Sequence, residues 1–362
     1  MARTSQIVAN QARLAHSDEA SRVIAAGAAS AGLVWPPEPF CPAGTLRERL
    51  CTSPFLMAPM ASVTDAAYRM MARAGGAALA YTEMVSVTGI HYGSEKTWSL
   101  VEPNVAEPDL AVQLFGADPE HFREAACRLG EHVGDRLALV DVNMACPVPK
   151  VTRGGAGSAL LDDPELAARI VGVLREELSV PVTVKIRLGR VPDHLVGVEF
   201  ARAMEAAGAQ AIAVHGRVAS QMYRGQSSAA AIAQIVEAVD VPVIASGDAL
   251  DARRAASLLR ETDAAACFVA RGSYGDPWVF SNARRVMAGL EPAEVTPSMR
   301  LNAFRLHVRL LGATGAHIAR ARSLAGWYLR GVPEAAAWRE RAMHCAALDD
   351  YLALADELEA SL

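Results

Sequence analysis

The segment Asp141–Lys150, which reads Asp-Val-Asn-Met-Ala-Cys-Pro-Val-Pro-Lys, carries the residues best suited to chemistry in this chain. An apolar run, Leu137 to Val142, leads into Asn143 and Cys146, and a glycine-rich stretch, Gly154 to Gly157, follows. A parallel α/β fold presents catalytic groups on such a loop, directly after a buried strand. We therefore predict that this loop forms part of an active site.

Three roles are open for Cys146: a buried structural thiol, a nucleophile or an acid. A nucleophilic cysteine needs a base nearby or a lowered pKa, and no Cys/His pair can be placed from the sequence. A thiol with the usual pKa of about 8.5 is largely protonated at neutral pH. We therefore predict that Cys146 is an acid.

The composition sharpens the interpretation of Lys185. Only three of the 35 Lys and Arg residues are lysines, namely Lys96, Lys150 and Lys185. Arginine therefore serves wherever a plain surface cation suffices. A compact ammonium at Lys185 would suit the N1/O2 edge of a flavin, where negative charge develops when the ring is reduced. The alternative is a lysine that reaches solvent from a strand end.

Short apolar runs alternate with helical patterns between Pro54 and about Arg285, which indicates repeated βα units and a parallel sheet. The eight runs are 55–58, 79–83, 110–114, 137–142, 182–186, 211–215, 241–245 and 264–270. Eight strands over roughly 230 residues match the size of a (β/α)8 barrel. We predict an α/β fold, a (β/α)8 TIM barrel followed by a C-terminal all-helical domain, rather than an open doubly wound sheet.

In such a barrel, the loops after the seventh and eighth strands form the usual phosphate site. Here they carry Ser246-Gly247-Asp248 and Ala270-Arg271. Arg271 can hold a phosphate through its forked guanidinium, so we expect a phosphorylated cofactor there. A salt bridge at the barrel rim and ordinary turn glycines are the alternatives. His215 is either a ring contact or a hydrogen-bonded rim histidine.

The region after Pro292 predicts helices over 299–311, 317–329 and 334–362, interrupted by glycine and proline. Between Val295 and Pro333 there are six arginines and no Asp or Glu; the arginines are at 300, 305, 309, 320, 322 and 330. Clustered arginine without acid is typical of a polyanion-binding surface, and Trp327-Tyr328 adds stacking area. A solvated helical face is the alternative. We predict an N-terminal extension over 1–50, the barrel over 51–292 and the helical domain over 293–362.

The overall composition bears on metal sites, disulfides, membrane segments and the cellular compartment. The six cysteines form no CxxC pair, so neither a zinc site nor a disulfide framework is expected. The chain contains no run of 18 apolar residues, so no membrane-spanning segment is predicted. The Ala/Gly-rich run Val23 to Trp35 lies too late, and after acidic residues, for a signal peptide. We expect a cytoplasmic monomer without a metal or membrane contact. The net charge of −5 excludes no partner.

The motifs of this chain, in their order, resemble those of the tRNA-dihydrouridine synthases. The likeness runs from about residue 54 to 335, and the full ordered set is specific although each motif alone is weak. The matching stretches are Ala58-Pro-Met60, Val63-Thr-Asp65 with Tyr68-Arg69, Gln113-Leu-Phe-Gly116, Asp141 to Lys150 with Gly157, Val184 to Gly189, His215-Gly-Arg217 with Gln221 to Gly225, Gly247-Asp248, and Arg271-Gly272 with Gly275 to Trp278.

The resemblance implies an FMN-bound barrel joined to a helical tRNA-binding domain, with NADPH or NADH as electron donor. The residues implied to hold FMN are Pro59, Met60, Ala61, Gln113, Asn143, Lys185, His215, Ser246, Gly247, Asp248, Ala270 and Arg271. The residues expected to contact tRNA are Arg217, Tyr223, Arg320 and Arg322. Reduced flavin would give hydride from N5 to C6 of a uracil, and Cys146 would protonate C5 from the other face. The target uridine must leave its stack, which favours flexible loop nucleotides.

Several positions depart from the family pattern. Ala145 and Ala270 stand where glycine is usual, and Ser246 replaces an asparagine. Ser323-Leu324 stands where a Lys-His pair is often found before Trp-Tyr. These changes concern FMN affinity and the grip on tRNA rather than the chemistry of Cys146 or Lys185.

The sequence leaves two other functions open. One is an FMN barrel oxidoreductase that acts on a small pyrimidine or enone, against which the C-terminal arginines argue. The other is a tRNA-binding homologue that has lost catalysis, which the substitutions at Ala145, Ser246 and Ala270 motivate.

Overall fold

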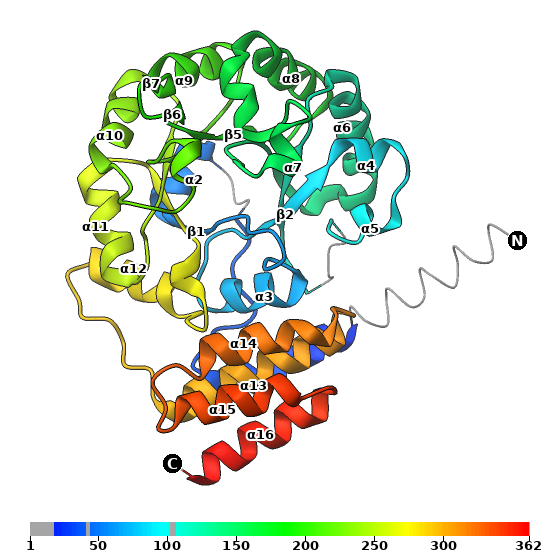
Figure 1. Cartoon of the computed structure of the whole chain (residues 1–362), viewed down its shortest axis with the longest axis vertical. Helices are drawn as coiled ribbons and strands as arrows, with labels where there is room; N and C mark the ends of the chain where they lie inside the picture. The colour runs from blue at the N-terminus through cyan, green and yellow to red at the C-terminus, as the bar shows by residue number, and fades with distance from the viewer. Residues whose placement is uncertain (1–17, 41–43, 102–105, 362) are drawn as a thin grey trace, which may run out of the picture.

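Eight parallel strands form a closed barrel, and a bundle of helices lies at one side of it (Figure 1). The computed structural model describes residues 18–40, 44–101 and 106–361. The barrel strands are β1 (Phe55–Met57), β2 (Tyr81–Ser86), β3 (Leu110–Phe115), β4 (Leu137–Met144), β5 (Val182–Arg187), β8 (Ile212–His215), β9 (Val243–Ser246) and β10 (Ala266–Val269). Each strand overlaps one predicted apolar run, so the (β/α)8 prediction is confirmed.

The strands are paired in the order β1-β10-β9-β8-β5-β4-β3-β2, and every neighbouring pair is parallel. The residues just before β2 close the ring against β1. The Met57 N–H donates to the Leu79 carbonyl at 3.0 Å, and a parallel bridge joins Met57 to Ala80. A closed ring leaves no unpaired strand edge and brings all eight carboxyl ends to one rim.

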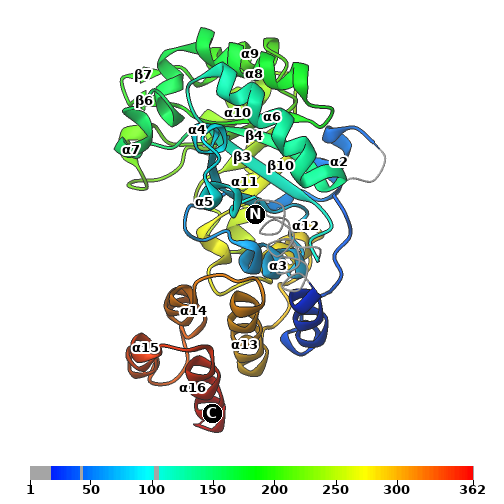
Figure 2. The same ribbon diagram turned by 90° about the vertical axis from the view of Figure 1, so that its right-hand side faces the viewer.

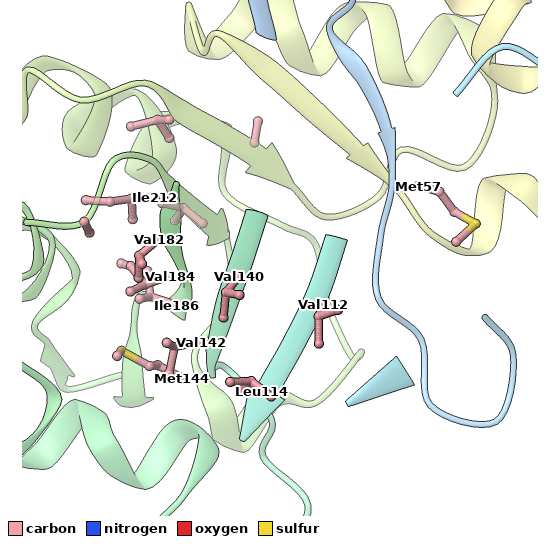
Figure 3. Close-up of a cluster of buried hydrophobic side chains, with 14 of the residues drawn as sticks. Met57, Val112, Leu114, Val140, Val142, Met144, Val182, Val184, Ile186 and Ile212 are labelled. Carbon is pink, nitrogen blue, oxygen red and sulfur yellow. The ribbon is translucent and has the colours of Figure 1, made fainter. Parts of the chain in front are cut away.

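The alternation of side chains along each strand separates the packing residues from the polar ones. Val140, Val142 and Met144 of β4 belong to the core between the sheet and its covering helices, together with Val184 and other branched residues of neighbouring strands (Figure 3). The residues between them belong to the barrel interior, where the second apolar cluster lies. Asp141 and Asn143 therefore face inward.

The strand register brings the inward polar residues level with one another. Asn143 on β4 pairs with Lys185 on β5, and Arg187 on β5 pairs with His215 on β8. His215 in turn pairs with Ser246 on β9. Because parallel strands run in the same direction, all of these residues lie at the carboxyl-end rim.

The helices that cover the barrel begin at clear sequence signals. Asp65, Asp118, Asp163, Ser228 and Asp251 each cap a helix by accepting a backbone N–H bond. The helices of the barrel region are α2 (Leu46–Thr52), α3 (Ala66–Ala74), α4 (Val87–His91), α5 (Glu95–Trp98), α6 (Pro119–Val133), α7 (Pro149–Thr152), α8 (Pro164–Glu177), α9 (Gly197–Ala206), α10 (Ala229–Ala238), α11 (Ala252–Thr262) and α12 (Val279–Met287).

The helical bundle consists of α13 (Pro297–Ala313), α14 (Ala321–Tyr328), α15 (Ala335–His344) and α16 (Leu348–Ser361). It has an apolar core of its own, and Figure 2 shows it below the barrel, next to α3. The predicted helix over 334–362 is two helices. Where the chain turns between them, the Asp350 carboxylate accepts the N–H groups of Ala346 and Ala347 at 2.8 and 2.9 Å.

The described part of the N-terminal segment packs on the helical bundle. Residues 18–27 are helical, and Ala20 and Ile24 are fully buried in the core of the bundle. The Trp278 indole donates to the Ala31 carbonyl at 2.9 Å. The small side chains of this Ala/Gly-rich run allow close packing on α13. Residues 1–17 lie outside the described residues.

The remaining features of the fold are a hairpin at the rim and the character of the helices. A short hairpin, β6 (Gly189–Val191) and β7 (His194–Leu195), follows β5 at the rim and was not predicted. Within the described residues, no helix combines the length and apolar character needed to cross a bilayer.

Candidate active site

A cavity of about 350 Å³ opens at the carboxyl ends of the strands. Its volume lies in the range of small-ligand sites. Every predicted FMN contact lines it, as do Cys146 and Tyr223. The residues that line the cavity and were not predicted include Met84, Phe268 and Tyr274. The structure thus brings the predicted residues to one place, and their individual roles remain predictions.

The loop that carries Cys146 is held from below by Asn143. The Asn143 Oδ1 accepts the backbone N–H of Cys146 at 2.9 Å and that of Ala145 at 3.2 Å. The Cys146 carbonyl accepts the Ser158 N–H at 3.0 Å. Gly157 has φ +62°, and a Cβ there would press on the Cys146 carbonyl. The half-buried thiol therefore sits on a loop that is fixed on both sides.

A row of hydrogen bonds extends from Asn143 into the barrel. The Asn143 amide donates to the Gln113 Oε1 at 2.8 Å, and the Gln113 amide donates to Asp141 at 2.7 Å. Thr183 donates to the other Asp141 oxygen at 2.7 Å. Burial raises the pKa of Asp141 to about 6, against the effect of these hydrogen bonds. The row fixes the orientation of both amide side chains.

Lys185 is a buried cation without a partner among the described residues. Its side chain is only 9% exposed, and no hydrogen bond or ion pair joins it to another described residue. Burial lowers its pKa to about 8; Arg187 adds to this effect, while Asp141 and Cys146 oppose it. A buried ammonium needs an acceptor to offset the loss of water. An electron-rich ligand in the cavity would supply that acceptor.

His215 lies beside this cation as a neutral ring. Burial and the nearby Lys185, Arg187, Arg217 and Arg271 lower its pKa to about 2. Arg217 carries no acceptor, so its contact of 3.3 Å with the His215 Nε2 assigns the ring proton to Nδ1. The imidazole therefore offers one N–H donor.

The loops after β9 and β10 form the other end of the cavity. Asp248 has φ +56° and accepts bonds from Arg217 and from the Ser227 N–H. Arg271 lies 3.5 Å from Asp248 and stacks its guanidinium 5.3 Å from the centre of the Tyr223 ring. Gly247 has φ +125°, and a Cβ there would overlap Ser227. Arg271 and the Asp248 carboxylate therefore lie side by side at this end of the cavity.

None of the three departures from the family pattern, at Ala145, Ser246 and Ala270, lies at a positive φ. Ala145 and Ala270 are absent from the described non-glycine residues with positive φ, and Ala270 has φ −109°. The Ala145 carbonyl accepts the Arg187 Nε–H at 2.9 Å, which needs no side chain. Ser246 contributes its backbone carbonyl to Gly216 at 3.1 Å.

Arg217 lies behind the cavity wall rather than in it. It is 1% exposed and donates to the carbonyls of Arg224 and Gly225 and to Asp248. Its donors thus hold the loop after β8 against the loop after β9. This position favours a structural contact over the predicted contact with tRNA.

The arginine-rich helical segment is largely neutralised by acids from elsewhere in the chain. Arg320 lies 2.9 Å from both Asp65 and Glu83, and the buried Arg305 pairs with Asp356 and Glu359. Arg309, Arg322 and Arg330 are exposed. Fewer arginines are therefore available to a polyanion than the sequence suggested.

The aromatic rings of Trp327-Tyr328, predicted to offer stacking surface, make contacts within the protein instead. Tyr328 is 2% exposed, and Trp327 stacks on Tyr274 with a centroid distance of 4.1 Å. Because Tyr274 lines the cavity, the bundle contacts the wall of the site.

Of two further residues on the cavity wall, Arg187 follows from the strand pattern and Tyr274 does not. Arg187 lies two residues after Lys185 on the same strand, so the alternation of side chains places both on the inner face. Its guanidinium also donates to the carbonyls of Val218 and Met222 at 3.1 Å. Tyr274 lies on a loop after β10, where no periodic signal points to the cavity.

Comparison with known proteins adds a family to this geometry. The sequence matches the dihydrouridine synthase (Dus) family over residues 56–361. tRNA-dihydrouridine synthase B of Xanthomonas axonopodis pv. citri is 37% identical over 309 residues, which cover 83% of this chain and 90% of that protein. tRNA-dihydrouridine synthase B of Yersinia pestis is 35% identical over 77% of this chain and 87% of its own length. The probable tRNA-dihydrouridine synthase 1 of Synechocystis sp. is 36% identical over 79% and 81%. This chain belongs to the dihydrouridine synthase family.

Proposed function

We propose that this protein reduces a uridine of tRNA to dihydrouridine, with FMN in the cavity and Cys146 as the proton donor. The relatives that share most of its length are tRNA-dihydrouridine synthases by name. The observation that carries the proposal is the placement of a buried, unpartnered ammonium and a thiol on the wall of one cavity. The register links them, since Lys185 pairs with Asn143, which holds the Cys146 loop.

The residues of the cavity fit FMN. Lys185 would hold the N1/O2 edge of the ring, and His215 would offer its Nδ1–H beside it. Gly247 leaves room that a Cβ would fill, and Arg271 would pair with the phosphate. When bound, FMN would supply the hydride that saturates the uracil ring.

Cys146 would deliver the proton to C5 of the base. Its thiol lies on the cavity wall, and Asn143 and Gly157 fix the loop that carries it. Positioned acids of this kind contribute about 10² to 10⁴ in rate. The target uridine would have to leave its stack to enter the cavity, and the exposed Met222 and Tyr223 lie at the wall it would pass.

The electron donor, the oligomeric state and the cellular location are part of the same proposal. We propose NADPH as the electron donor, a monomeric state and a cytoplasmic location. The exposed Arg309, Arg322 and Arg330 would contribute phosphate contacts to the bound tRNA.

The test is reconstitution of the reaction. We expect the purified protein to bind FMN and, with NADPH, to form dihydrouridine in tRNA taken from a strain that lacks the gene. Sequencing-based mapping of dihydrouridine would show which position is reduced. A protein that binds FMN and reduces free uracil but leaves tRNA unchanged would contradict the proposal, as would a protein that binds tRNA but no flavin.

A further inference from the structure

The structure gives Arg320 a position that the sequence did not suggest. Arg320 ends a short 3-10 helix (Ile318–Arg320) before α14, and its side chain crosses to the barrel. We infer that Arg320 is a positioning residue for the flavin: through Glu83 and Asp65 it holds the cavity-lining loop Pro59–Ala61 in place. The inference rests on the proposed function in that FMN is the ligand of this cavity.

Glu83 connects Arg320 to the end of that loop. One carboxylate oxygen of Glu83 accepts the Arg320 Nη2–H at 2.9 Å, and the other accepts the Ser62 N–H at 2.6 Å. Glu83 is only 8% exposed, so both bonds are largely shielded from water. Ser62 directly follows Ala61, which lines the cavity.

Ser62 needs such a constraint because of its backbone conformation. It has φ +62°, which costs a non-glycine residue free energy and persists only where the surroundings enforce it. The bond from the Ser62 N–H to Glu83 supplies this enforcement at the turn. If Glu83 moved away, the turn could relax and carry Pro59–Ala61 with it.

Asp65 fixes the other end of the same turn. Its Oδ2 accepts the Arg320 Nη1–H at 2.9 Å, and its Oδ1 accepts the Tyr68 N–H that begins α3. Between these ends, the Thr64 hydroxyl donates to the Met60 carbonyl at 3.2 Å. One guanidinium from the bundle thus holds both ends of the segment Ala61–Asp65.

The charges explain why an arginine is needed here. Burial raises the pKa of Asp65, and the nearby Glu83 raises it further, whereas Arg320 lowers it. Without Arg320, two poorly hydrated carboxylates would face each other and separate. A planar guanidinium can bridge both at once, whereas a lysine ammonium lacks that forked geometry.

A direct contact of Arg320 with tRNA is the competing explanation. Both Nη groups of Arg320 already donate to carboxylates, so a phosphate would have to displace them. The two explanations differ in what they predict. A positioning role affects FMN affinity without any tRNA present, whereas a phosphate contact affects only tRNA binding and its salt dependence.

The experiment compares FMN affinity among variants of the full chain, measured in the absence of tRNA by quenching of FMN fluorescence. We expect Arg320→Ala and Glu83→Ala each to raise the FMN dissociation constant about tenfold, and the double variant to add little, because both break one relay. Arg320→Lys should give an intermediate value. Arg341→Ala is the matched control, since Arg341 is an exposed bundle arginine whose ion pair is with Glu357 of α16, and its FMN affinity should stay within about twofold of the wild type.

A second readout needs no flavin. Hydrogen exchange of peptides that cover residues 58–65 should be faster in Arg320→Ala than in the wild type, and unchanged in Arg341→Ala. If Arg320→Ala fails to fold, Arg320→Lys carries the test on both readouts. Unchanged FMN affinity and unchanged exchange in a folded Arg320 variant would overturn the inference.

The outcome can be separated from that of the proposed function. A wild type that binds FMN but forms no dihydrouridine would contradict the proposed function and leave the comparison of variants intact. A wild type that binds no FMN would also contradict it, and the exchange measurement would then decide whether Arg320 holds the loop.

Discussion

The side-chain oxygen of Asn143 accepts the backbone N–H of Cys146 at 2.9 Å. This bond places the thiol relative to the barrel, because Asn143 is itself held by Gln113 and pairs with Lys185 across the strands. Cys146, the proposed proton donor, and Lys185, the proposed flavin contact, thus share one rigid support. We expect their relative placement to control the rate of proton transfer.

Asn143→Ala should therefore slow the reaction more than it weakens substrate binding. It removes the acceptor for the N–H groups of Cys146 and Ala145, so the loop would sample positions in which the thiol is misplaced. We expect kcat for dihydrouridine formation to fall about 10²-fold, with a smaller change in KM for tRNA. A change confined to KM would contradict this positioning role.

Cys146→Ala should retain the fold and the flavin but lose uridine reduction. The substitution removes a half-buried thiol that makes no side-chain hydrogen bond within the described residues, so the free energy of unfolding should change little. Single-turnover formation of dihydrouridine should slow by about 10² to 10⁴. Cys51→Ala, which alters a different, exposed cysteine, should behave like the wild type. Normal turnover of Cys146→Ala would refute the acid role.

FMN affinity should fall as the pH rises through about 8. Lys185 has a pKa lowered to about 8, so its ammonium form, which attracts the flavin, is present below that pH and is lost above it. If only the ammonium form binds, the dissociation constant should be about tenfold higher at pH 9 than at pH 7. Fluorescence titrations at both values check this. In Lys185→Met the affinity should be weaker and nearly independent of pH over the same range.

Replacing an arginine of the bundle should change either the salt dependence of tRNA binding or the stability of the fold. Arg322 is exposed, and its replacement by alanine should lower the slope of log K against log salt for tRNA by about one. Arg305 is 8% exposed and pairs with Asp356 and Glu359. Arg305→Ala should instead lower the free energy of unfolding by about 1 to 2 kcal/mol. Thermal unfolding and salt titrations of both variants separate the classes, and equal salt slopes in the wild type and Arg322→Ala would exclude that residue from the interface.

The sequence by itself determined the barrel and the contents of its rim. The apolar runs predict the eight strands because strands buried on both faces need continuous branched residues. The period of two along each strand then places Asn143 and Lys185 on the inner face. Local patterns of this kind suffice because backbone geometry, rather than distant contacts, decides them.

Only the tertiary structure decided which charges are free. The sequence shows no acid between Val295 and Pro333, yet Asp65 and Glu83 from the barrel neutralise Arg320, and α16 neutralises Arg305. The tertiary structure also decided that residues 18–27 pack in the bundle and that Tyr274 lies in the cavity wall. Such pairings join residues far apart along the chain, and no local period or propensity encodes them, because electrostatic and packing energies depend on distance in space.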